Sequence, residues 1–112
     1  MTVVDRDIAI DAARRALDAS TGVVYVDRLV RQAGTVQLGA ESHEVEGPSL
    51  LVFRDEMPGA NWMHPCTYAL VGLDSGELLL TVASDRPPAF GRLPDTWVVA
   101  ADPDAIADLL PP

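Results

Sequence analysis

The first apolar pattern along the chain has helical spacing. Ile8, Ala12 and Ala16 recur every four residues, which places them along one face of a helix. Ser20-Thr21-Gly22 follows as a stop signal, with glycine where a left-handed C-cap would fall. The sequence therefore predicts an N-terminal amphipathic helix. Its expected apolar face comprises Ile8, Ala12, Ala16 and Leu17 with Ala9 and Ala13 beside them, and its expected polar face comprises Asp7, Asp11, Arg14, Arg15 and Asp18.

From Val23 onward the pattern is typical of strands. The two strongest candidates, residues 49–54 and 67–71, are nearly continuous apolar runs, so we expect both of their faces to be covered. Leu73-Asp74-Ser75-Gly76-Glu77 predicts a hairpin turn, because glycine adopts a positive φ without strain. The other expected strands are residues 23–26 with apolar character continuing at Leu29 and Val30, residues 35–38 and 43–45, residues 78–83 and residues 96–100.

A capping pattern near residue 102 predicts a short C-terminal helix. Asp102 suits an N-cap and Pro103 the first helical position. The sum is an α+β fold with an N-terminal helix, a mostly antiparallel sheet of about five to seven strands and a short closing helix. Because the 112 residues contain no internal repeat and no linker, we expect a single domain over residues 1–112. The apolar stripe of the closing helix would be formed by Ile106, Leu109 and Leu110.

The charge of the chain narrows the class of partner. The formal net charge is −9 and the pI is near 4.3, whereas nucleic-acid binding needs clustered Lys and Arg. All eight basic residues are arginine, a bias that GC-rich, bacterial-type codon usage explains. The absence of lysine also removes a Schiff-base nucleophile. We therefore expect no nucleic-acid partner.

Cysteine usage and apolar run lengths bear on location and cofactors. One cysteine cannot form an internal disulfide, no apolar leader opens the sequence, and no apolar run is long enough to cross a bilayer. We expect a soluble cytoplasmic protein without a membrane partner. The glycines show no phosphate-binding spacing and the serines no nucleophile-elbow context, so no cofactor is expected.

The densest chemistry lies between two strand candidates, at residues 55–66. His64 and Cys66 are two positions apart, so in an extended chain their side chains share a face, where imidazole could hold a thiolate. This makes Cys66 and His64 candidate catalytic residues. The alternative is a buried structural thiol beside a hydrogen-bonded histidine, which the apolar strand after Cys66 favours.

A metal site is the third interpretation of the same residues. His64 and Cys66 would be two ligands, and His43, Asp55 or Glu56 would complete the set. Structural zinc sites usually show two close ligand pairs, and this chain supplies one. We therefore do not expect a bound metal, although His43, His64 and Cys66 are the candidates for one.

The remaining residues of this stretch suit contact with another protein. Asp55 and Glu56 are adjacent, so on a strand they would face opposite ways and could not act as an acid–base pair. After a turn at residues 58–61, Trp62 and Met63 would either cover the core or form an exposed anchor. The candidate binding residues are Asn61, Trp62, Met63, Asp55 and Glu56.

Two functional hypotheses of different class follow. The first is a small acidic, non-enzymatic binding or accessory module, of the inhibitor or immunity type or a complex subunit, that docks on a larger protein. The alternative is a small enzyme or metal-binding protein that uses His64 and Cys66. The absence of catalytic motifs favours the first. A symmetric homodimer is a third hypothesis, because small sheets with exposed apolar strands often bury them by pairing with a second copy.

Overall fold

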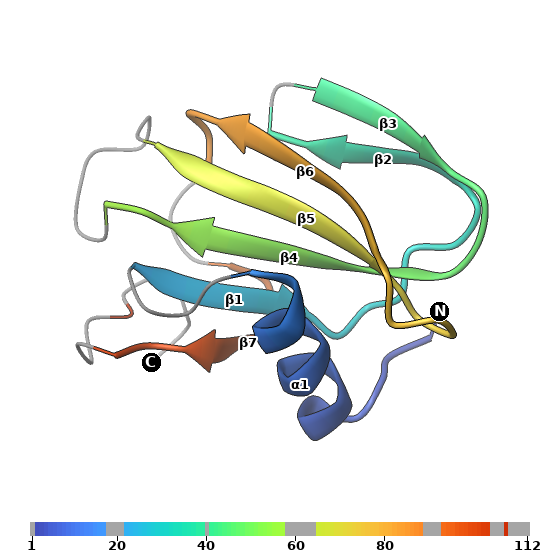
Figure 1. Cartoon of the computed structure of the whole chain (residues 1–112), viewed down its shortest axis with the longest axis horizontal. Coiled ribbons are helices and arrows are strands. Elements are labelled where there is room, and N and C mark those ends of the chain that lie inside the picture. Colours follow the sequence, from blue (N-terminus) through green and yellow to red (C-terminus); the bar gives the residue numbers. More distant parts are fainter. Residues whose placement is uncertain are drawn as a thin grey trace.

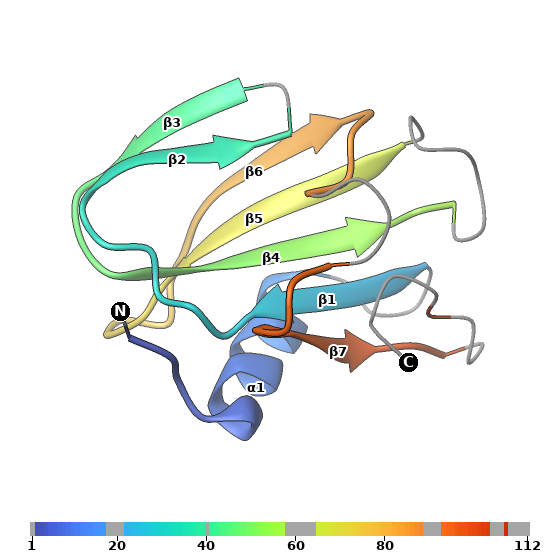
Figure 2. The same cartoon turned by 180° about the vertical axis from the view of Figure 1, so that it is seen from behind.

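The computed structural model describes residues 2–17, 22–39, 41–57, 65–88, 93–103 and 107. In this part of the chain there are one helix and seven strands (Figures 1 and 2). The predicted α+β fold with a mostly antiparallel sheet is thereby confirmed. The elements in chain order are α1 (Arg6–Ala16), β1 (Val23–Asp27), β2 (Gly34–Leu38), β3 (Glu41–Val45), β4 (Ser49–Asp55), β5 (Cys66–Gly72), β6 (Leu78–Ser84) and β7 (Trp97–Ala101).

Five of the strands form one antiparallel sheet, in the order β6-β5-β4-β1-β7, and β2 and β3 form a separate hairpin. The first strand therefore lies between two strands that come later in the chain. Its Val26 pairs with Val52 of β4 on one side and with Val98 of β7 on the other. The predicted turn between β5 and β6 is confirmed, and its Gly76 has a φ of 69°.

The sheet separates two apolar cores. On β1, Val24 and Val26 belong to the core under α1, whereas Val23 and Tyr25 belong to the core under the β2–β3 hairpin. Figures 1 and 2 show α1 against the β1 and β7 end of one face, with the hairpin toward the β6 end. Because β4 and β5 have apolar cores on both faces, their nearly continuous apolar runs are explained as predicted.

Helix α1 buries most of the predicted apolar face, with Ile8 as the exception. Ile8 is 57% exposed, whereas Ala9 and Ala13 are fully buried and Ala12 nearly so. Alanine has the smallest side chain that still favours a helix, so an alanine face lets α1 lie close against β7 and β1. The prediction that Ile8 faces the core is therefore wrong, because close packing selects the alanines.

The helix also ends earlier than the sequence predicts. Its last residue is Ala16, and Leu17 is already extended, with φ −125° and ψ 143°. The expected left-handed glycine is present at Gly22, where φ is 69°. It stands directly before β1, so it serves the entry into that strand and does not cap the helix.

Most of the predicted C-terminal helix, including Ile106, Leu109 and Leu110, lies outside the described residues. The described residues at this end show no helix: Pro103 lies in a turn, and the Asp102 carboxylate accepts a hydrogen bond from the Ala107 N–H at 2.9 Å. Within the part of the chain that the structure describes, no helix has the length and apolar character needed to span a membrane.

Candidate functional site

The structure describes some of the predicted site residues and leaves others outside. Asn61, Trp62, Met63 and His64 fall in residues 58–64, which lie outside the described ranges. Those that are described are His43, Asp55, Glu56 and Cys66.

The two adjacent carboxylates are in different environments. Asp55 is 1% exposed and accepts a hydrogen bond from the Met57 N–H at 3.0 Å. Glu56 is exposed, and it accepts a hydrogen bond from the Thr67 hydroxyl at 3.1 Å. The structure buries Asp55, so its carboxylate is not exposed at the surface, and its contact role stays a prediction. Glu56 is the predicted contact residue that is both described and exposed.

Cys66 is placed as a structural thiol. It lies directly across from Asp55 in the β4–β5 register and is 1% exposed. Its Sγ donates to the carbonyl oxygens of Ser84 at 3.5 Å and Arg86 at 3.4 Å, and the Tyr68 hydroxyl also donates to the Arg86 carbonyl, at 2.6 Å. These bonds tie the start of β5 to the end of β6 and the residues after it.

The electrostatics of Cys66 oppose thiolate formation. Burial, followed by the negative charge of Asp55, raises the pKa of the thiol to about 11. A cysteine nucleophile needs the opposite, a lowered pKa and an accessible sulfur. As described, Cys66 lacks both properties of a nucleophile.

In the folded protein, Cys66 is expected to resist iodoacetamide at neutral pH and to react only as the pH approaches about 11. Asp55→Asn should lower the pH at which Cys66 reacts, because the negative charge of Asp55, which raises the pKa of the thiol, is removed. The folded pKa lies above the ordinary value of 9.0, so this group should make stability fall as pH rises from about 9 to about 11. Mass spectrometry of alkylated protein across pH, with urea-unfolded protein as the control, measures this. Rapid modification at neutral pH would contradict it.

The described residues do not assemble a metal site. His43 lies on β3 opposite Val36, and its Nε2 is buried without a hydrogen-bond partner. Within the described ranges, no three His, Cys, Asp or Glu side chains come close enough together to hold a metal ion. His43, Asp55, Glu56 and Cys66 are therefore not brought together into such a set.

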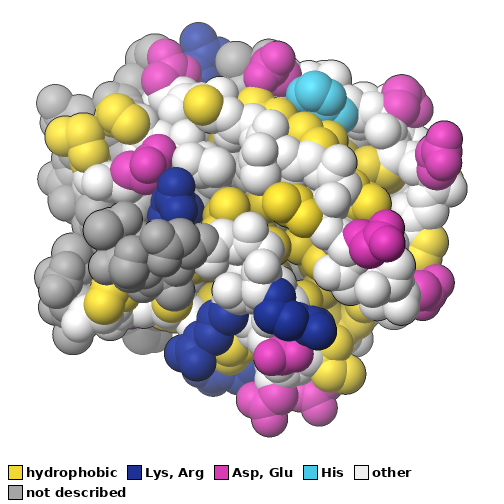
Figure 3. Space-filling view, viewed as in Figure 1, with side chains coloured by type: hydrophobic (Ala, Val, Ile, Leu, Met, Phe, Trp, Pro, Cys, Tyr) yellow, Lys and Arg dark blue, Asp and Glu magenta, His cyan; other side chains and the backbone are white. Residues whose placement is uncertain are grey.

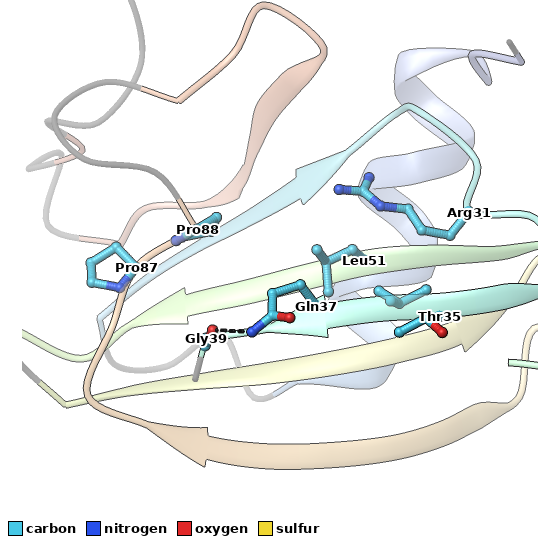
Figure 4. Close-up of a pocket in the computed structure, with 8 residues that line it drawn as sticks. Arg31, Thr35, Gln37, Gly39, Leu51, Pro87 and Pro88 are labelled. Carbon is cyan, nitrogen blue, oxygen red and sulfur yellow. Dashed lines mark hydrogen bonds between the residues drawn. The ribbon is translucent and has the colours of Figure 1, made fainter. Parts of the chain in front are cut away.

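A small cavity of about 280 Å³ lies between β2 and the residues after β6, with Leu51 of β4 at its base (Figure 4). Its polar side chains are already engaged. The Gln37 amide donates to the Gly39 carbonyl at 2.8 Å, and an Arg31 N–H pairs with the carboxylate of Asp27. The described residues that line it include no Asp, Glu, His or Cys, so it offers no acid–base or nucleophilic group.

A larger hollow of about 440 Å³ lies beside β6, and we name it the β6 groove. It runs between the end of β3, the β5–β6 turn and the start of β6. Its surface combines apolar side chains with carboxylates from two separate segments. The apolar members are Val45, Leu73, Leu79 and Leu80, and the acidic members are Glu44, Glu46 and Asp74.

The charged residues that line the β6 groove are all acidic, and Arg15 approaches the adjoining β5–β6 turn at Gly76 without lining the groove. Figure 3 shows acidic side chains on the right of the molecule, beside the β3–β4 connection and the β5–β6 turn of Figure 1. Hydrophobic side chains appear between them, and no arginine is visible on that side in this view. Glu44, Glu46 and Asp74 are all exposed, so they present carboxylates to whatever occupies the groove.

Strand β6 is one of the two edge strands of the described sheet and the more exposed of them, the other being β7. Within the described residues β6 pairs with β5 alone. Leu78 and Leu79 are each 49% exposed, and the register shifts at this point, so that Leu80 pairs with Leu70 and Leu78 with Val71. Leu79 is thus the extra residue of a β-bulge, at the end of β6 that borders the groove.

Sequence reasoning identified β6 as a strand but missed the β6 groove. One signal was present: Leu78-Leu79-Leu80 breaks the alternation expected of a half-buried strand, without a second covered face to explain it. The acidic members could not be placed together from the sequence, because Glu44 lies on β3 and Asp74 in the β5–β6 turn.

The described geometry thus offers an exposed apolar edge strand with an acidic groove beside it, and a buried thiol at Cys66. Comparison with known proteins adds no assignment, since the chain matches no protein-family model, no curated protein and no solved structure.

Proposed function

We propose that this chain is a small acidic, non-enzymatic module that docks on a larger protein through the β6 edge and the β6 groove. The observation that carries the proposal is the uncharged edge strand. Proteins usually protect an exposed edge with charged residues, proline or β-bulges; β6, with the sequence Leu-Leu-Leu-Thr-Val-Ala-Ser, has a bulge at Leu79 but neither a charge nor a proline. Its two half-exposed leucines supply apolar surface of the kind that partners bury.

The charge of the chain supports a basic protein surface as the partner. The net charge of −9 would steer a positively charged surface toward the molecule and speed association. Local carboxylates at the groove would select that partner over an acidic one. Nucleic acid is disfavoured by the same charges. A cytoplasmic location is part of the proposal, and the buried, unpaired thiol of Cys66 suits a reducing compartment.

The enzyme and metal-binding alternative has less support. It depends on Cys66 as a nucleophile or ligand, and the thiol is buried, hydrogen-bonded to two carbonyl groups and raised in pKa. A docking role does not require Cys66 to be exposed or to form a thiolate.

A matched pair of exposed hydrophobic residues tests the proposal. A photo-crosslinking amino acid at Leu79 should capture a discrete partner in native cells, whereas the same group at Ile8 should not, although Ile8 is the more exposed. With the captured protein purified, Leu79→Arg should weaken binding about tenfold or more, because it adds charge repulsion and removes an apolar contact. Ile8→Arg should leave binding nearly unchanged. Titration calorimetry measures both.

Thermal unfolding of each variant provides the control for folding. Leu79→Thr places a β-branched residue, which favours strands, at this position and should also weaken binding, so a folding defect in Leu79→Arg would not leave the test undecided. Equal capture from positions 79 and 8, or equal affinity of the two arginine variants, would refute this docking surface.

A further inference from the structure

The free edge of β6 and the acidic β6 groove beside it specify more than a protein partner. We infer that the partner presents an extended segment of alternating apolar and cationic residues, and that this segment adds to β6 as a further strand. This inference rests on the proposed function and names the chemistry that the same site would recognise.

The backbone of β6 provides the first requirement. Every antiparallel strand points half of its N–H and C=O groups to each side, and within the described sheet β6 uses only the side toward β5. An extended segment can bond to the other side, as in other strand-addition complexes. A helix could not satisfy this row of groups, because its own N–H and C=O groups are already paired along the helix.

The β6 groove provides the second requirement, a place for side chains. Leu79 and Leu80 lie at its β6 side and Val45 at its β3 side, so an added strand that runs along this end of β6 meets apolar surface. Leu80 and Val45 also pack in the core under the hairpin. The apolar floor is therefore anchored to the fold and is not a loose surface patch.

The carboxylates provide the third requirement, a preference for cations. Glu44 and Glu46 approach from the end of β3 and the residue after it, and Asp74 approaches from the β5–β6 turn. The Thr35 hydroxyl hydrogen-bonds to the Glu44 carboxylate, which helps to fix its position. Because side chains of an added strand alternate in direction, apolar residues would face the leucines while Arg or Lys residues reach the carboxylates.

The same charges argue against a second copy of this chain as the occupant. Two copies joined edge to edge through β6 would each bring a net charge of −9 to the interface. Like charges brought together at an interface oppose association. A cationic segment of a different protein removes that repulsion.

Three synthetic peptides of about eight residues test the inference, all with blocked ends. The first alternates arginine and valine, the second alternates glutamate and valine, and the third is the first with N-methyl groups on the amides that would bond to β6. We expect the arginine peptide to bind, and to bind more weakly as salt is raised. We expect each of the other two to lose at least about tenfold in affinity. Fluorescence anisotropy of labelled peptides measures this.

Charge-matched variants separate the groove from general attraction. The triple change Glu44→Gln, Glu46→Gln and Asp74→Asn should weaken the arginine peptide about tenfold. The triple change Asp7→Asn, Glu41→Gln and Asp95→Asn alters the net charge equally at exposed positions outside the groove, and should have less than about a twofold effect. Binding should also slow hydrogen exchange of β6 amides, which NMR spectroscopy reads residue by residue.

Strand addition is overturned by equal binding of the N-methylated and unmodified arginine peptides, or by equal losses from the two triple variants. The arginine peptide failing to bind would overturn it as well. These failures are distinct from failure of the proposed function, because crosslinking from position 79 would still capture a partner that docks without adding a strand. If that crosslinking fails while the arginine peptide binds through β6, strand addition by a cationic segment is supported and docking on a native protein partner is refuted.

Discussion

Replacing Phe53 with alanine is expected to lower the free energy of unfolding by about 3–5 kcal/mol. Phe53 lies on the central strand β4 and is fully buried in the core under the hairpin. Its ring lies 6.0 Å from that of Tyr25 and 5.3 Å from that of Tyr68, measured between centroids. The substitution removes these ring contacts and leaves a cavity between strands that cannot move together without disturbing the rest of the sheet.

Chemical denaturation followed by circular dichroism measures the loss. Phe53→Leu is the matched control, since it keeps apolar volume at the position and should cost much less than alanine. Because small domains are commonly stable by only about 5–15 kcal/mol, the alanine variant should lose a large share of the total. A loss below about 1 kcal/mol would show that this core can close around the gap.

A series of three glycine-to-alanine substitutions is expected to separate backbone strain from steric clash. At Gly47 an added Cβ meets nothing within 4 Å, and at Gly76 it meets only an Arg15 side-chain nitrogen at 3.9 Å, although φ there is +69°. At Gly22 φ is also +69°, and the Cβ would lie 2.4 Å from the backbone carbonyl oxygen of Asp55. Gly22→Ala should therefore be the most damaging.

The expected losses in unfolding free energy follow from these geometries. Gly47→Ala should be near neutral, because alanine mainly reduces the entropy of the unfolded chain. Gly76→Ala should lose about 1 kcal/mol from the left-handed backbone. Gly22→Ala should lose about 3 kcal/mol, since the clash with rigid backbone of β4 adds to the same strain. Equal losses at Gly22 and Gly76 would show that the start of β1 shifts to accept the methyl group.

Local patterns along the chain predict the individual elements better than their partners. Residues 49–54 and 67–71 are recognisable as central strands because both faces are apolar, and Gly76 marks the turn before β6. One residue of the helix face was predicted wrongly, because Ile8 is exposed whereas the smaller Ala9 and Ala13 pack against the sheet. The periodicity of apolar residues does not predict how closely a helix packs against a sheet.

The candidate site was harder to predict from the sequence than the helix and strands. Residues 55–66 attracted attention by residue type, yet Asp55 and Cys66 are buried across from one another in the sheet. The β6 groove instead combines Glu44 and Asp74, which meet only because the hairpin folds toward β6. The groove is formed by common residue types from separate segments of the chain, so no local sequence motif predicts it.

The place of β1 between β4 and β7 has a consequence for how the chain acquires its structure. During synthesis, α1 and β1 emerge before the other described elements, and the strand that completes one side of β1 is the last of the described strands to be made. Because α1 packs mainly against β7 and β1, its alanine face also lacks most of its support until then. Pairing between such distant segments slows folding, so the final structure must form late, after the ribosome has released nearly all of these residues.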